Sequence, residues 1–170
     1  MSGRALATAP ACTAIPMAVG SPRLLVIGYG NPGRQDDGLG PAAAAEIEKM
    51  GWPTVTTLDN YQLVLEDAVE LAAHDVVWFV DATRGGDAPC AIESLSPVLD
   101  VTFTSHLLKP EALLAIAAQQ FRRVPEAYLV SIRGYEFDFS EGLSDRARSN
   151  LARAIQLLRG RIGDRLKVSR

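Results

Sequence analysis

Short apolar runs alternate with longer amphipathic stretches along most of this chain. Apolar runs occupy residues 24–28 (LLVIG) and most of residues 76–82 (VVWFVDA), and the last strand is predicted at residues 127–134 (AYLVSIRG). Runs of this length are typical of strands buried on both faces of a parallel sheet. Residues 54–59 and 91–96 alternate between apolar and polar positions, and we expect the second of these to be an edge strand.

The stretches between these strands show helical periodicity. They predict helices over 41–50, 62–73, 110–121 and 143–162. Strands that alternate with helices indicate an α/β fold. We therefore expect a three-layer α/β/α sandwich, built on a mostly parallel, twisted sheet of about five strands with one antiparallel edge strand.

Length and composition fit one globular domain. The chain has 170 residues, of which 48% are hydrophobic and 22% charged, a balance that excludes a disordered chain. We assign residues 23–165 to a single α/β domain. Pro10 and Pro16 interrupt the Ala-rich segment 1–22, which we expect to be an unstructured extension rather than a secretory leader.

The distribution of charge disfavours several classes of function. Residues 1–145 carry 9 Lys and Arg against 19 Asp and Glu, whereas residues 146–170 carry 8 against 1. An acidic body repels nucleic acids.

Cys12 and Cys90 lie too far apart in sequence to predict a disulfide framework or a zinc knuckle. No apolar run approaches the roughly 20 residues of a membrane span, so we expect a cytoplasmic protein.

Polar residues follow the predicted parallel strands directly. The first strand leads into GYGNPGRQDDGLG (28–40), the third ends at Asp81, and His106 precedes the helix predicted at 110–121. Ligands of open α/β sheets bind outside the carboxyl ends of the strands. Asp37, Asp81 and His106 are therefore expected on one rim, where two carboxylates and an imidazole suit a divalent transition metal with open coordination positions.

Each of these residues also has a structural interpretation. Asp36 and Asp37 are suited to the first turn of a helix, and one of them can serve that purpose alone. Asp81 needs a partner when it is partly buried. His106, and more strongly His74, can be hydrogen-bonded structural histidines.

The glycines at 28, 30 and 33 formally match a dinucleotide-binding fingerprint. In that motif the helix begins within the glycines, so that its free N–H groups meet the pyrophosphate. Here two adjacent carboxylates follow the glycines, and the helical pattern starts later. This alternative is therefore disfavoured.

The run IGYGNPGRQDDGLGPA resembles the opening motif of the [NiFe]-hydrogenase maturation endopeptidases. The segments VVWFVDA, SHLLKPEALLAIA and RGYEFDFSEGLS are similar to later segments of that family and occur in the same order. The resemblance covers about residues 23–160. The chain departs from the family at 59–62 (DNYQ), where many members have Asp-Gly-Gly-Thr.

The resemblance implies that the chain removes a C-terminal extension from a nickel-loaded hydrogenase large-subunit precursor. It places the family's metal-engaging residues on Asp37, Asp81 and His106, with nickel supplied by the precursor. Asp36 or Asp37 is the candidate general base, so the implied catalytic set is Asp36, Asp37, Asp81 and His106. We expect a monomer whose partner is the precursor. A dinucleotide-binding oxidoreductase domain and a non-catalytic chaperone of the large subunit are the alternatives.

Overall fold

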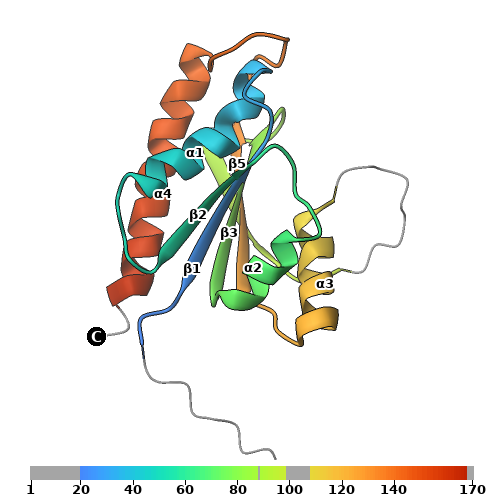
Figure 1. Ribbon diagram of the computed structural model, residues 1–170. Coiled ribbons are helices and arrows are strands. Elements are labelled where there is room, and N and C mark those ends of the chain that lie inside the picture. The colour runs from blue at the N-terminus through green and yellow to red at the C-terminus, as the bar shows by residue number, and fades with distance from the viewer. Residues whose placement is uncertain (1–19, 88, 99–107, 168–170) are drawn as a thin grey trace, which may run out of the picture.

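A five-stranded sheet forms the centre of the computed structural model, which describes residues 20–87, 89–98 and 108–167 (Figure 1). The strand order is β2-β1-β3-β5-β4. The pairs β1–β2, β1–β3 and β3–β5 are parallel, and β4 is antiparallel to β5. The mostly parallel sheet and its antiparallel edge strand, predicted from the sequence, are thus confirmed. The strands are β1 (Leu24–Tyr29), β2 (Val55–Asn60), β3 (Val76–Thr83), β4 (Cys90–Leu95) and β5 (Glu126–Arg133).

Helices cover both faces of the sheet, which confirms the three-layer α/β/α architecture. Figure 1 shows α1 and α4 on one face and α2 and α3 on the other. A short 3-10 helix, η1, leads into α1. The helices are η1 (Gln35–Gly38), α1 (Leu39–Glu48), α2 (Asp67–Ala73), α3 (Pro110–Phe121) and α4 (Asp145–Lys167).

The continuous apolar run of β3 serves two separate cores. Trp78 and Val80 belong to the cluster formed with α1 and α4, whereas Val77 and Phe79 belong to the cluster formed with α2 and α3. Successive side chains of a strand point to opposite faces, so a strand between two helical layers needs apolar residues at every position. The absence of polar alternation in this run follows from that position.

The helix α2 is shorter than the predicted helix at 62–73. The carboxylate of Asp67 accepts hydrogen bonds from the Asn60 side-chain amide, at 3.0 and 3.1 Å, and from the Val64 N–H group at 2.9 Å. These bonds hold residues 61–66 in a turn against the end of β2. The periodicity of the sequence does not show these side-chain contacts.

The final helix is longer than predicted, since α4 continues to Lys167. Ile162 is completely buried and Leu166 packs against the same core, so the apolar face extends to the helix end. None of the helices in the described ranges is long and apolar enough to cross a membrane. Most of the predicted extension 1–22 lies outside the described residues.

Candidate functional site

The carboxyl ends of β1 and β3 lie side by side at the centre of the sheet. Gly28 pairs with Val80, so Tyr29 and Asp81 follow at the same level. From β1 the chain continues to β2 on one side, and from β3 it continues to β4 and β5 on the other side. This reversal of direction is where open α/β sheets form a ligand crevice. We call the residues at this position the β1/β3 rim.

Asp81 is a partly buried carboxylate at this rim. Its Oδ1 accepts a hydrogen bond from the N–H group of Ala82 at 2.8 Å, and the Tyr29 side chain bonds to the same carboxylate. Burial raises the pKa of Asp81 to about 6; these two hydrogen bonds oppose the rise, and the charge of Asp37 adds to it. A carboxyl group with this pKa can gain or lose a proton near neutral pH.

Asp37 lies in η1, directly before α1. Its carboxylate accepts a hydrogen bond from the backbone N–H group of Asn31 at 3.0 Å. Because its charge acts on Asp81, the structure brings these two predicted site residues to the same rim. Two neighbouring carboxylates supply oxygen ligands suited to a divalent cation.

The third predicted ligand, His106, lies outside the described residues. Glu111, in the first turn of α3, acts on Tyr29 through its charge. Within the described part of the chain, no group of three His, Cys, Asp or Glu side chains is arranged to hold a metal ion.

Asp36, which was predicted as a candidate base or a helix-terminal residue, is fully buried. Its carboxylate accepts hydrogen bonds from the N–H groups of Tyr135 (2.7 Å), Glu136 (2.9 Å) and Ser144 (2.7 Å), and from the Ser144 hydroxyl (2.8 Å). Burial by itself would raise the pKa of Asp36, but these bonds more than offset it and lower the pKa below its ordinary value. This environment favours the structural interpretation that the sequence left open for one of the pair.

The loop before α1 is also fixed by the segment that precedes α4. The Gln35 N–H group donates to the Ser140 carbonyl at 2.9 Å. The Arg34 guanidinium lies over the Phe139 ring, 4.9 Å from its centroid. Together with the bonds of Asp36, these contacts hold Asp37 in place by anchoring the three residues that precede it.

Sequence reasoning did not single out Tyr29, Asn31 and Tyr61. Burial raises the pKa of Tyr29 well above its ordinary range, and the charges of Asp81 and Glu111 add to this, so the phenol stays protonated. The Asn31 side-chain amide donates to the Tyr61 hydroxyl. The available signal was the position of Tyr29 as the last residue of a buried strand, immediately before a site loop.

The glycines of the loop allow close packing rather than phosphate binding. A Cβ atom on Gly28 would lie 2.0 Å from the carbonyl oxygen of Gly40, so β1 and α1 touch through their backbones. The loop N–H groups already have acceptors: Gly30 donates to the Asn60 carbonyl, Asn31 to Asp37, and Gly33 to the Asn31 side chain. A pyrophosphate would find these three donors occupied.

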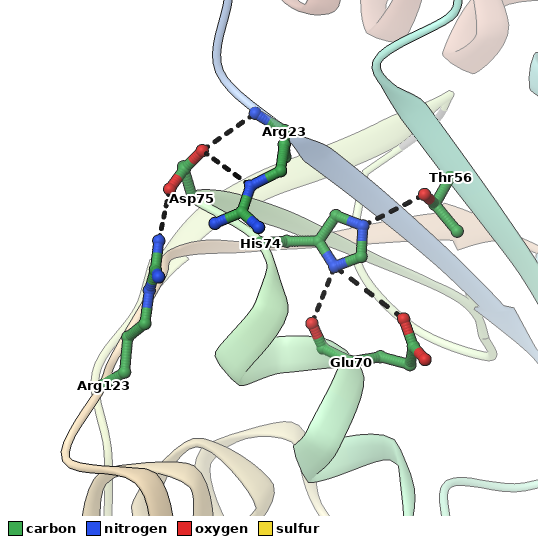
Figure 2. Close-up of polar contacts among 6 residues, drawn as sticks. All are labelled: Arg23, Thr56, Glu70, His74, Asp75 and Arg123. Carbon is green, nitrogen blue, oxygen red and sulfur yellow. Dashed lines mark hydrogen bonds and ion pairs between the residues drawn. The ribbon is translucent and has the colours of Figure 1, made fainter. Parts of the chain in front are cut away.

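His74 belongs to a separate polar cluster at the amino ends of the strands, shown in Figure 2. Its Nδ1 atom lies 2.7 Å from the Glu70 carbonyl oxygen, and its Nε2 atom lies 3.0 Å from the Thr56 hydroxyl. Next to it, Asp75 forms ion pairs with Arg23 and Arg123. His74 is thus a hydrogen-bonded structural histidine, as the sequence favoured.

Comparison with known proteins identifies the fold. No family model and no curated relative matches this chain. Among solved structures, the hydrogenase maturating endopeptidase HybD from E. coli is similar, with a TM-score of 0.66 and 20% identity over 84% of this chain and 93% of that one. The [NiFe] hydrogenase maturation protease HycI from Thermococcus kodakarensis has a TM-score of 0.65 and 23% identity over 87% and 94% of the two chains.

A hydrogenase 2 maturation peptidase from a Thaumarchaeota archaeon gives a third match. Its TM-score is 0.61, with 22% identity over 83% of this chain and 98% of that one. The resemblance seen in the sequence motifs is therefore confirmed at the level of the fold, over nearly the whole length of these structures.

Proposed function

We propose that this chain is an endopeptidase that removes a C-terminal extension from a nickel-loaded [NiFe]-hydrogenase large-subunit precursor. The observation that carries the proposal is the position of Asp81 at the β1/β3 rim, where the charge of Asp37 acts on it, in a fold shared with solved hydrogenase maturation proteases. In this proposal the precursor is the protein partner, and the nickel belongs to the substrate.

The rim residues would recognise the nickel that the precursor carries. Carboxylate oxygens from Asp37 and Asp81 and an imidazole nitrogen from His106 form a mixed donor set suited to nickel. His106 precedes α3 by four residues, and the first turn of α3 acts on the rim through Glu111. These contacts would hold the adjacent peptide bond in a fixed position for attack by water.

The three carboxylates Asp36, Asp37 and Asp81 have different roles in the proposed reaction. The four hydrogen bonds of Asp36 use its carboxylate fully and keep it from the substrate, so we give Asp36 a positioning role. A carboxylate cannot bind nickel and take up a proton from water at the same moment. Asp37 and Asp81 are therefore the two carboxylates that meet the substrate and its nickel, and the water is activated by a group that is not bound to the nickel at that moment.

The test is a processing assay with purified precursor in nickel-loaded and nickel-free forms, read by the loss of C-terminal mass. We expect cleavage of the loaded form only, and we expect His106→Ala and Asp81→Asn to abolish it. The control is Asp164→Asn, an exposed carboxylate near the end of α4, which should process normally. Efficient cleavage of nickel-free precursor, or normal processing by His106→Ala, would contradict the proposal.

The same material distinguishes the two alternatives. A non-catalytic chaperone would bind the loaded precursor without any loss of mass. A dinucleotide-binding oxidoreductase would show a saturable change in fluorescence when titrated with NADH, and we expect none, because the loop donors are occupied.

A further inference from the structure

We propose that a second site, beneath α4 and separate from the β1/β3 rim, binds a small organic carboxylate with a flat apolar body. A cavity of about 290 Å³ lies there, lined by Trp78, Ile92, Ser94, Tyr128, Arg161 and Arg165. Known small-molecule sites begin at about 300 Å³. The size of the cavity therefore fits a compact ligand.

The wall formed by the sheet is a row of side chains that are aligned in register. Trp78 of β3 pairs with Tyr128 of β5, and Tyr128 pairs with Ser94 of β4. The Trp78 and Tyr128 rings stack with centroids 4.4 Å apart. Ile92 lies two residues before Ser94 and so shares its face of the sheet. The wall is flat and mainly apolar, with one hydroxyl group at its edge.

The opposite wall carries the charge. Arg161 and Arg165 are four residues apart on α4 and so lie on the same face of the helix. Arg165 bonds to the Glu126 carboxylate and, at 2.9 Å, to the Tyr128 hydroxyl, so its charge is balanced. The ion pairs among the described residues leave Arg161 without an acidic partner. One uncompensated positive charge therefore borders the cavity.

Trp78 supplies the second indication of a ligand. Among the described residues, its Nε1–H group is the buried side-chain polar atom that lacks a hydrogen-bond acceptor. Buried donors in folded proteins are nearly always paired. Because this atom is sealed from solvent, a ligand oxygen would reach it and provide the missing acceptor after a small shift of the lining side chains.

These features together select the chemical class. A carboxylate matches the fork of the Arg161 guanidinium and balances its single charge. A flat apolar body matches the aromatic wall and Ile92. The site is distinct from the rim, because Trp78 and Asp81 are three residues apart on β3 and so point to opposite faces of the sheet.

The experiment uses the Trp78 indole resonance in a two-dimensional ¹H–¹⁵N spectrum. The chain contains two tryptophans, so Trp52→Phe leaves Trp78 as the only indole signal. We expect benzoate to move this signal in a saturable way. Benzamide, a neutral molecule of the same shape, should bind at least about tenfold more weakly. Inorganic phosphate, which lacks the apolar body, should leave the signal unchanged.

The matched variants are Arg161→Gln and Arg159→Gln. Both residues are exposed on α4, so neither change threatens the fold, but Arg159 does not line the cavity. Arg161→Gln should weaken benzoate binding about tenfold, and Arg159→Gln should not alter it. The absence of a saturable shift, an equal response to benzamide or phosphate, or equal binding by Arg161→Gln would overturn the proposal.

Discussion

Asp36 accepts two hydrogen bonds from Ser144, one from its backbone N–H group and one from its hydroxyl, across 108 residues of sequence. Ser144 lies immediately before α4. This pairing joins the loop after β1 to the beginning of the last helix. Asp37, the next residue, is thereby held at the rim, and its own carboxylate accepts a hydrogen bond from the Asn31 N–H group.

Asp36→Ala should destabilise the fold strongly. The change leaves four donors without their acceptor in a buried environment, and we expect a loss of about 3–5 kcal/mol in the free energy of unfolding. Asp37→Ala removes a single hydrogen bond from the Asn31 amide and should cost about 1 kcal/mol. Urea denaturation of both variants measures the difference, and equal losses would contradict the interpretation of Asp36.

The same carboxylate should make the protein sensitive to acid. The folded-state pKa of Asp36 lies below the ordinary value of 3.8, so its stabilising effect is present above that pH and is lost as the pH falls through the folded-state pKa. Because Asp36→Ala lacks the group, its unfolding free energy should depend less steeply on pH below about 4.

Asp81→Asn should keep or increase stability while it removes activity. The pKa of Asp81 is raised to about 6, chiefly by burial. The folded state therefore holds this proton more tightly than the unfolded chain, and stability falls as the pH rises from about 4 to about 6. An amide removes this cost, and we expect a gain of about 1 kcal/mol at pH 7 and none at pH 4. Thermal melts at the two pH values measure it, and unfolding of the variant would indicate a structural role instead.

Tyr29→Phe should raise the pKa of Asp81. The hydrogen bond from Tyr29 stabilises the ionised carboxylate and opposes the effect of burial, so its removal moves the pKa upwards. A ¹³C NMR titration of the Asp81 carboxyl carbon measures the shift directly, without substrate. Tyr61→Phe is the control, because the Tyr61 hydroxyl contacts Asn31 and should leave the titration of Asp81 unchanged.

Gly40→Ala should be one of the most harmful single-methyl additions in the chain. The new Cβ atom would lie 2.3 Å from the Tyr29 carbonyl oxygen and 2.5 Å from that of Val80, and neither backbone atom can move easily. We expect a loss of about 3 kcal/mol. Gly160→Ala, on the exposed side of α4 with no atom within 4 Å, should instead gain about 0.5–1 kcal/mol. Urea denaturation of both variants measures these changes in the free energy of unfolding. If Gly40→Ala does not lose stability relative to Gly160→Ala, the contact between β1 and α1 is not tight.

The sheet and its layers were predictable because β1 and β3 are apolar at successive positions, as is typical of strands buried on both faces. The edge position of β4 was predictable from its alternation. The start of α2 was not, since the side chain that delays it, Asp67, is held by Asn60 from the preceding strand. Hydrophobic periodicity predicts which face of a helix is buried, but it does not predict a side-chain contact of this kind.

The candidate site shows the same division. Topology was enough to place Asp37 and Asp81 on one rim, because parallel strands end at the same edge of a sheet. The different environments of Asp36 and Asp37 were not readable, because the donors to Asp36 come from residues 99 to 108 positions later. The effect of Tyr29 on the pKa of Asp81 depends on how deeply Asp81 is buried, and the sequence pattern does not predict that burial.

The distance in sequence between Asp36 and its donors also sets the order in which the rim can form during synthesis. A nascent chain that has emerged only as far as β5 contains both Asp37 and Asp81 but leaves the buried charge of Asp36 without its partners. Burial of that unpaired charge would be costly, so the loop cannot settle against β1 until the segment before α4 has left the ribosome. The two rim carboxylates are therefore held in place only in a nearly complete chain, and a prematurely terminated product would lack an ordered rim.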